Sequence, residues 1–137
     1  MNTPRIPLPE PAEMNDAQRA VFDKVVSGPR GMLIGPLRAA MHNPVLADRW
    51  QAFGQVLRFE TCLPPKLSEL AILVAARHWN SELEWTIHAS EARRAGLDAA
   101  LMEALRQGET PHFPTDDVRE VYEFSRELLE NGQISDD

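Results

Sequence analysis

The chain has 137 residues, of which 43% are hydrophobic and 26% charged, and this composition suits one globular domain with its own core. A net charge of −7 without a dense Lys/Arg stripe argues against a nucleic-acid partner. The longest apolar run, residues 70–76, is too short to span a bilayer, and no export signal is visible. We therefore expect a soluble cytoplasmic protein with no membrane partner.

Four prolines, at positions 4, 7, 9 and 11, indicate an extended arm over residues 1–15 that can pack on a neighbouring molecule. Residues 16–137 are expected to form one helical domain, because capping residues, prolines and glycines punctuate a helical pattern and no segment alternates as a strand does. The expected helices span about residues 16–26, 36–41, 43–59, 66–79, 81–95, 98–106 and 115–130.

The helix over residues 66–79 is apolar on nearly every face, which predicts a central position in the fold. The helix over residues 81–95 follows it after a short turn, so the two should form an antiparallel pair. The fold class expected from these features is all-α, a helical array with short connections.

Few residues offer thiol or metal chemistry. Cys62 is the single cysteine and has no adjacent histidine, so an incidental or buried thiol is a better interpretation than a nucleophile. The four histidines fall on different expected elements, and the chain holds neither an HExxH motif nor paired cysteines. The sequence predicts no metal site and no cofactor.

Glu69 lies within a largely apolar helix, where a buried carboxylate would need a partner or become a proton carrier. The alternative is a carboxylate in the first turns that gains from the helix dipole or pairs with Lys66. Glu84 and His88 stand four residues apart on the next helix, with Trp85 beside them, so both side chains share one face. Such a pair can support acid–base chemistry, although the same spacing also occurs in surface pairs and satisfied core histidines.

The segment LSELAILVAARHWNSELEWTIHASEARRAGL, residues 67–97, resembles the signature region of the carboxymuconolactone decarboxylase family, and HNPVLADRW before it resembles the preceding helix of that family. The most specific element is a glutamate followed nineteen residues later by a histidine, which Glu69 and His88 match. In the alkylhydroperoxidase D branch a CxxC pair lies between them, but Ser81 and Glu84 occupy those positions here. A dithiol peroxidase cycle is therefore disfavoured.

The resemblance implies an alkylhydroperoxidase D-like fold and a cofactor-independent lyase that decarboxylates a small carboxylated lactone from aromatic catabolism. It assigns acid–base catalysis to His88, with Glu84 and Glu69, because the enolate left by carbon dioxide must be stabilised and protonated. Arg77 or Arg58 is expected to hold the substrate carboxylate. Family members commonly form trimers or hexamers, so the resemblance implies a homo-oligomer, and it implies further helical residues after NGQIS, residues 131–135.

Two alternatives remain open at this point: a redox protein that uses Cys62, and a non-catalytic oligomeric binding protein. For the leading interpretation the antiparallel pair makes a geometric prediction. Glu69 lies eleven residues before Asn80 and His88 eight after it, which at 1.5 Å per residue places them at similar heights, about 16 and 12 Å from the turn. We expect Glu69, Glu84 and His88 to converge on a partly enclosed pocket, with Trp85 in its wall.

Overall fold

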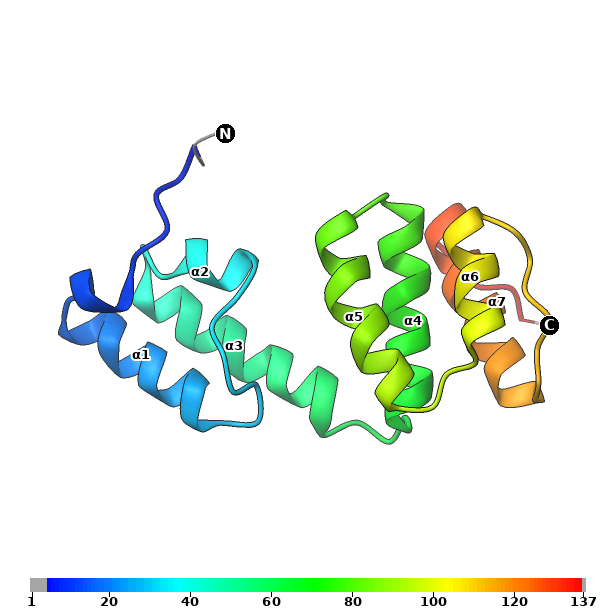
Figure 1. The fold of residues 1–137 in the computed structure, drawn as a ribbon, viewed down its shortest axis with the longest axis horizontal. Coiled ribbons are helices and arrows are strands. Elements are labelled where there is room, and N and C mark those ends of the chain that lie inside the picture. Colours follow the sequence, from blue (N-terminus) through cyan, green and yellow to red (C-terminus); the bar gives the residue numbers. More distant parts are fainter. Residues whose placement is uncertain (1–4, 137) are drawn as a thin grey trace. The chain divides into compact units, whose positions relative to one another are not determined.

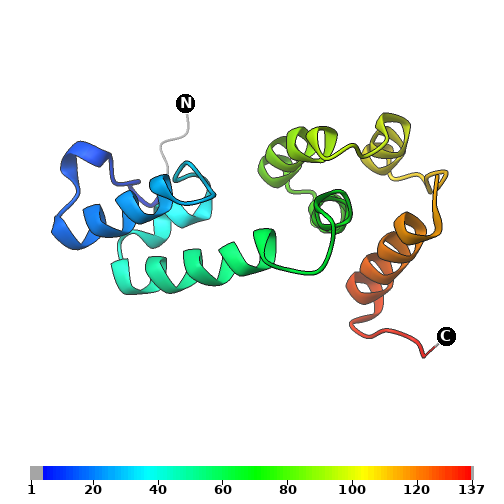
Figure 2. The ribbon, with the colours of Figure 1, turned by 90° about the horizontal axis from the view of Figure 1, so that it is seen from below.

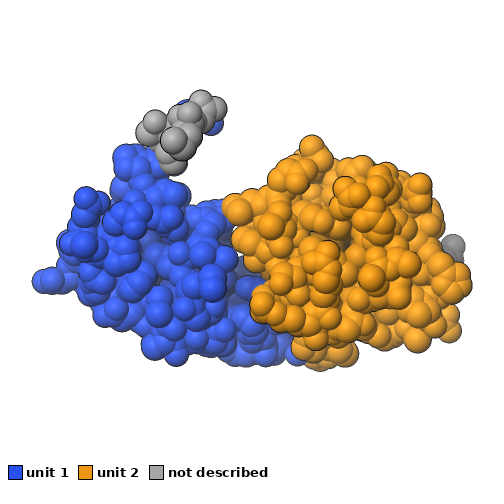
Figure 3. Space-filling view, in the orientation of Figure 1, with its two compact units in different colours: residues 1–61 blue, residues 62–137 orange. Residues whose placement is uncertain are grey.

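The structure is a computed structural model that describes residues 5–136, and in that range it consists of helices and connecting segments. The residues fall into two compact units, Met1–Thr61 and Cys62–Asp137 (Figure 3). The expected all-α class is confirmed. The expected boundary between an arm (residues 1–15) and one helical domain (residues 16–137) stays a prediction, because a division into compact units does not test it.

The first unit holds a short 3-10 helix and three α-helices (Figure 1). Asn15 and Gln18 form a reciprocal capping box at the start of the first α-helix: each side-chain oxygen accepts the other residue's backbone N–H at 3.0 Å. A small apolar cluster formed by Val21, Val25, Leu37, Ala40, Met41 and Ala47 holds these helices together. The helices are η1 (Pro11–Glu13), α1 (Asp16–Ser27), α2 (Pro36–Ala40) and α3 (Pro44–Phe59).

The proline-rich segment lies against its own unit in the part that the structure describes. His42 Nε2 donates a hydrogen bond to the Pro7 carbonyl oxygen at 2.6 Å, and Arg38 pairs with Glu10 at 2.8 Å. The 3-10 helix η1 also interrupts the extended conformation that the prolines predict. Pro4 lies outside the described residues.

The second unit holds four helices, and α4 is central, as expected, because it contacts each of the other three. Figure 2 shows α4 nearly end-on with α5, α6 and α7 around it. Leu70, Leu73 and Leu101 are fully buried in the apolar cluster that these helices share. The helices are α4 (Pro65–His78), α5 (Glu82–Arg94), α6 (Ala99–Gln107) and α7 (Asp116–Asn131).

The turn between α4 and α5 has a left-handed residue at its centre. Asn80 adopts a positive φ of 51°, a conformation that asparagine tolerates better than most residues. The turn reverses the chain, so that α4 and α5 run antiparallel and side by side (Figure 1). Gly96 ends the next helical segment with a φ of 82°, which a residue with a Cβ atom rarely adopts. These two positions fix the ends of the helix pair that carries the candidate site.

Candidate functional site

Helices α4 and α5 bring three acid–base side chains together. His88 Nδ1 lies 2.6 Å from Glu69 Oε2, within hydrogen-bond distance, and these residues are nineteen apart in the chain. His88 Nε2 lies 3.4 Å from Glu84 Oε2, one turn earlier on the same helix. The structure thus places both imidazole nitrogens next to carboxylates. The catalytic roles of the three residues stay predictions.

The two carboxylates differ in their surroundings. Glu69 and His88 are both buried, so their hydrogen bond lies in a region of low dielectric where it is strong and directional. The Glu84 side chain is 39% exposed, against 8% for that of His88. Glu69 therefore fixes the orientation of the imidazole through Nδ1, while Nε2 faces the carboxylate that reaches solvent.

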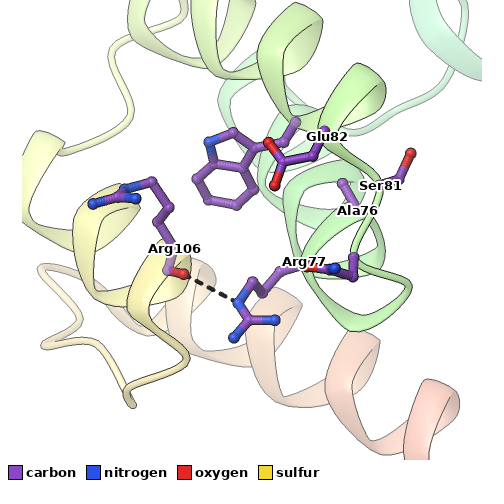
Figure 4. Close-up of a pocket in the computed structure, with 7 residues that line it drawn as sticks. Ala76, Arg77, Ser81, Glu82 and Arg106 are labelled. Carbon is purple, nitrogen blue, oxygen red and sulfur yellow. Dashed lines mark hydrogen bonds between the residues drawn. The ribbon is translucent and has the colours of Figure 1, made fainter. Parts of the chain in front are cut away.

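Trp85 and Arg77, which the sequence predicts as substrate-binding residues, line one cavity of about 170 Å³ at the α4–α5 turn (Figure 4). Arg77 Nε donates a hydrogen bond to the Arg106 carbonyl oxygen at 3.1 Å, which ties the end of α4 to α6. The lining of this cavity includes none of the three acid–base residues. The complete lining consists of Ala76, Arg77, Asn80, Ser81, Glu82, Trp85 and Arg106.

Arg58 belongs to α3 in the first unit, and its guanidinium carbon lies 5.0 Å from the centre of the Phe59 ring. This distance permits a cation–π contact. The expected role of Arg58 as a carboxylate anchor stays a prediction.

Cys62 is a free, exposed thiol in the segment before α4, so of the two alternatives the buried thiol is wrong and the incidental thiol stays a prediction. It lies two residues before Pro64, the N-cap residue of α4. Across residues 5–136 no group of three or more His, Cys, Asp or Glu side chains has an arrangement that would hold a metal ion. None of the described helices has the length and apolarity needed to cross a membrane.

The sequence interpretation missed Arg106, Glu82 and Asn80 as neighbours of Arg77. Arg106 lies on α6, whose orientation relative to α4 depends on tertiary packing and has no local sequence signal. Glu82 could have been found from the sequence, because a residue in the first turn of α5 must lie near the end of α4 in an antiparallel pair.

Arg106, which lines the cavity, forms an ion pair with Glu103 that should respond to acid. Two hydrogen bonds join the Arg106 guanidinium to the Glu103 carboxylate, at 2.6 and 3.0 Å. With a further bond from Gln107, they lower the pKa of Glu103 from 4.5 to about 2. A depressed carboxylate pKa adds stability that is fully present above about pH 4.5 and disappears as the pH falls through about 2.

We therefore expect the difference in unfolding temperature between the unaltered protein and Glu103→Gln to shrink as the pH falls from 4.5 to 2. High salt should also shrink it, because the pair is exposed. Carboxyl-carbon NMR titration gives the pKa of Glu103 directly. A midpoint near 4.5 would contradict the expectation.

Comparisons of the chain with protein-family models, curated proteins and solved structures find no match. The resemblance of residues 67–97 to the carboxymuconolactone decarboxylase family therefore stays a prediction, as does an alkylhydroperoxidase D-like arrangement of the helices. The interpretation of the site rests on its own geometry.

Proposed function

We propose that the protein is a cofactor-independent lyase of the carboxymuconolactone decarboxylase type, which decarboxylates a small carboxylated lactone by acid–base chemistry. One observation carries the proposal: the buried contact of 2.6 Å between His88 Nδ1 and Glu69 Oε2, with Glu84 Oε2 at 3.4 Å from the other imidazole nitrogen. An imidazole held in this way is oriented for proton transfer.

In this mechanism His88 Nε2 is the atom that exchanges protons with the substrate. The bond between the ring carbon and the carboxylate breaks, carbon dioxide leaves, and the electron pair enters the conjugated lactone as an extended enolate. Protonated His88 then gives its Nε2 proton to a carbon of the enolate. Water returns a proton to the imidazole past the half-exposed Glu84, so the net reaction consumes one proton from solvent.

The substrate carboxylate needs a cationic anchor, and we retain Arg77, which lies on the same helix as Glu69, because a guanidinium can hold a carboxylate through two parallel hydrogen bonds. A dithiol redox function has less support. Cys62 is the one cysteine of the chain, and Ser81 and Glu84 stand where a CxxC pair would provide attacking and resolving thiols. The exposed Cys62 by itself lacks a resolving partner within the chain.

A homo-oligomer, either a trimer or a hexamer, is part of this proposal, and so is a cytoplasmic location. One face of α3 exposes large apolar side chains at helical spacing, which favours association with another surface. These side chains are Leu46, Trp50, Phe53 and Leu57. Sedimentation that returns only a monomer of 15.4 kDa would contradict the oligomer.

The direct test supplies carboxymuconolactone to the purified protein in D₂O without added metal or cofactor. We expect one carbon dioxide released and one deuterium incorporated into carbon for each lactone consumed. Glu123→Gln, which alters an exposed ion pair on α7, serves as the matched control and should react equally fast.

A rate no higher than that without protein would contradict the proposal and favour the non-catalytic binding protein. Reduction of an organic peroxide with a dithiol, abolished in Cys62→Ser, would favour the redox alternative. We expect no such reduction above the level of the Cys62→Ser variant.

A further inference from the structure

We propose that the cavity at the α4–α5 turn is a binding site for a compact monocarboxylate with one planar ring, held by Arg77 and Trp85 (Figure 4). This site shares Arg77 with the lyase proposal and in that respect rests on it, but its lining contains none of the three acid–base residues, so ligand binding and lyase activity can be tested separately. The cavity has a fixed cation, an aromatic wall, a volume that suits one ring, and an acidic residue that disfavours a second negative charge.

The cation is Arg77, and its side chain is held in place before any ligand arrives. Its Nε donates to the Arg106 carbonyl oxygen at 3.1 Å, and its Nη2 lies beside Gly108, where a Cβ atom would come within 2.9 Å of it. Within residues 5–136 Arg77 forms no ion pair. A half-buried guanidinium without a carboxylate partner can accept an anionic ligand, and its fixed geometry lowers the entropy lost on binding.

Arg106, the second arginine of the lining, is already neutralised. Its guanidinium forms two hydrogen bonds to Glu103, at 2.6 and 3.0 Å. Its aliphatic stem can still form part of the wall. Arg77 is therefore the cation of this cavity that remains available to a ligand.

The aromatic wall and the volume define the rest of the ligand. The indole of Trp85 and the methyl group of Ala76 give the cavity an apolar side, on which a planar ring can stack. A dry cavity of about 150 Å³ accepts benzene, whereas pockets for drug-sized molecules begin at about 300 Å³. At about 170 Å³ this half-open cavity takes one ring and leaves the carboxylate to meet Arg77.

Two polar residues of the lining, Ser81 and Glu82, further define which ligand the cavity should prefer. Ser81 occupies the N-terminal cap position of α5 but makes no capping hydrogen bond through its side chain, so its hydroxyl is available to a ligand oxygen. Glu82, exposed in the first turn of the same helix, lines the cavity with a carboxylate. This second charge repels anions, so the site should prefer a monocarboxylate to a dicarboxylate.

The test is a titration of the full chain with benzoate, followed by amide and indole N–H NMR signals, with the Trp85 indole signal identified from Trp85→Phe. We expect saturable shifts centred on Trp85 and the α4–α5 turn. Benzamide, which has the same shape without the charge, should bind at least tenfold more weakly. Phthalate should also bind more weakly than benzoate.

The protein variants separate the contributions of the two charges. Arg77→Gln should weaken benzoate binding at least tenfold, and Glu82→Gln should tighten it several-fold. Arg119→Gln, which removes an exposed arginine of α7, is the matched control and should leave binding unchanged. Because Arg77 also supports α6, the comparison of benzoate with benzamide tests the charge without altering the protein.

Equal affinity for benzoate and benzamide would overturn the proposal, as would shifts confined to other parts of the chain. Weaker benzoate binding in Glu82→Gln would also overturn it, because that result would mean that the Glu82 carboxylate does not repel the bound anion. The His88→Gln protein should bind benzoate with the affinity of the unaltered protein. Benzoate binding can therefore be measured whether or not the protein is a lyase.

Discussion

Replacing His88 by glutamine should lower kcat/KM for the carboxylated lactone by about 10² to 10⁴, the range over which a positioned acid or base accelerates a reaction. Glutamine can still donate a hydrogen bond to Glu69, but its amide does not exchange a proton near neutral pH. In the proposed lyase mechanism the loss should appear in kcat, because the enolate is protonated after the substrate has bound.

Two further variants distinguish proton transfer from a structural effect. Glu69→Gln keeps a hydrogen-bond acceptor for His88 Nδ1 but removes the negative charge, so we expect an intermediate loss of activity with the fold retained. Glu123→Gln on α7 should keep full activity. Far-ultraviolet circular dichroism and the unfolding temperature report whether each variant is folded. A folded His88→Gln protein within threefold of the original activity would remove His88 from the mechanism.

Leu73→Ala should destabilise the second unit by about 3 to 4 kcal/mol, through lost burial and the cavity that remains. Leu73 is 0% exposed on the central helix α4 and belongs to the larger of the two buried apolar clusters in residues 5–136. Leu83→Ala is the matched control, because Leu83 is 52% exposed on α5 and its truncation should change the stability by less than about 0.5 kcal/mol.

Native-state hydrogen exchange of the α4 and α5 amides measures this effect where it occurs. The chain holds two compact units, so a global unfolding signal can combine two transitions. In Leu73→Ala the protected amides of α4 should exchange about 10² to 10³ times faster, the factor that corresponds to 3 to 4 kcal/mol. Equal acceleration in Leu83→Ala would contradict the assignment of Leu73 to the core.

The helices could be predicted because local signals determine their ends. The side-chain oxygens of Asn15, Asn43 and Asp98 accept the backbone N–H of Gln18, Leu46 and Leu101, so these three residues cap their helices. Ser81 and Thr115 occupy the cap positions of α5 and α7 without a capping hydrogen bond from their side chains. The approach of Glu69 to His88 could also be predicted, because an antiparallel pair with a short turn places residues at similar heights opposite each other.

The cavity could not be predicted in the same way. Arg77 meets the Arg106 carbonyl oxygen across 29 residues, and that contact depends on how α6 packs against α4. No residue pattern near either arginine specifies this packing. The short helix η1 was missed because prolines suit both extended and 3-10 segments. The division into two compact units likewise follows from tertiary contacts that a single sequence does not display.

At the end of α5, the left-handed conformation of Gly96 restricts which residue can occupy position 96. The restriction comes from the chirality of the α-carbon and not from a lack of space. A Cβ atom built on this glycine meets nothing within 4 Å, yet its φ of 82° is unfavourable for an L-residue. L-alanine would therefore be strained in an open site. In a chemically synthesised protein, D-alanine at position 96 would satisfy the backbone that L-alanine opposes, and it would also restrict the unfolded chain. The handedness of one α-carbon, independent of any packing contact, thus determines which residues position 96 accepts.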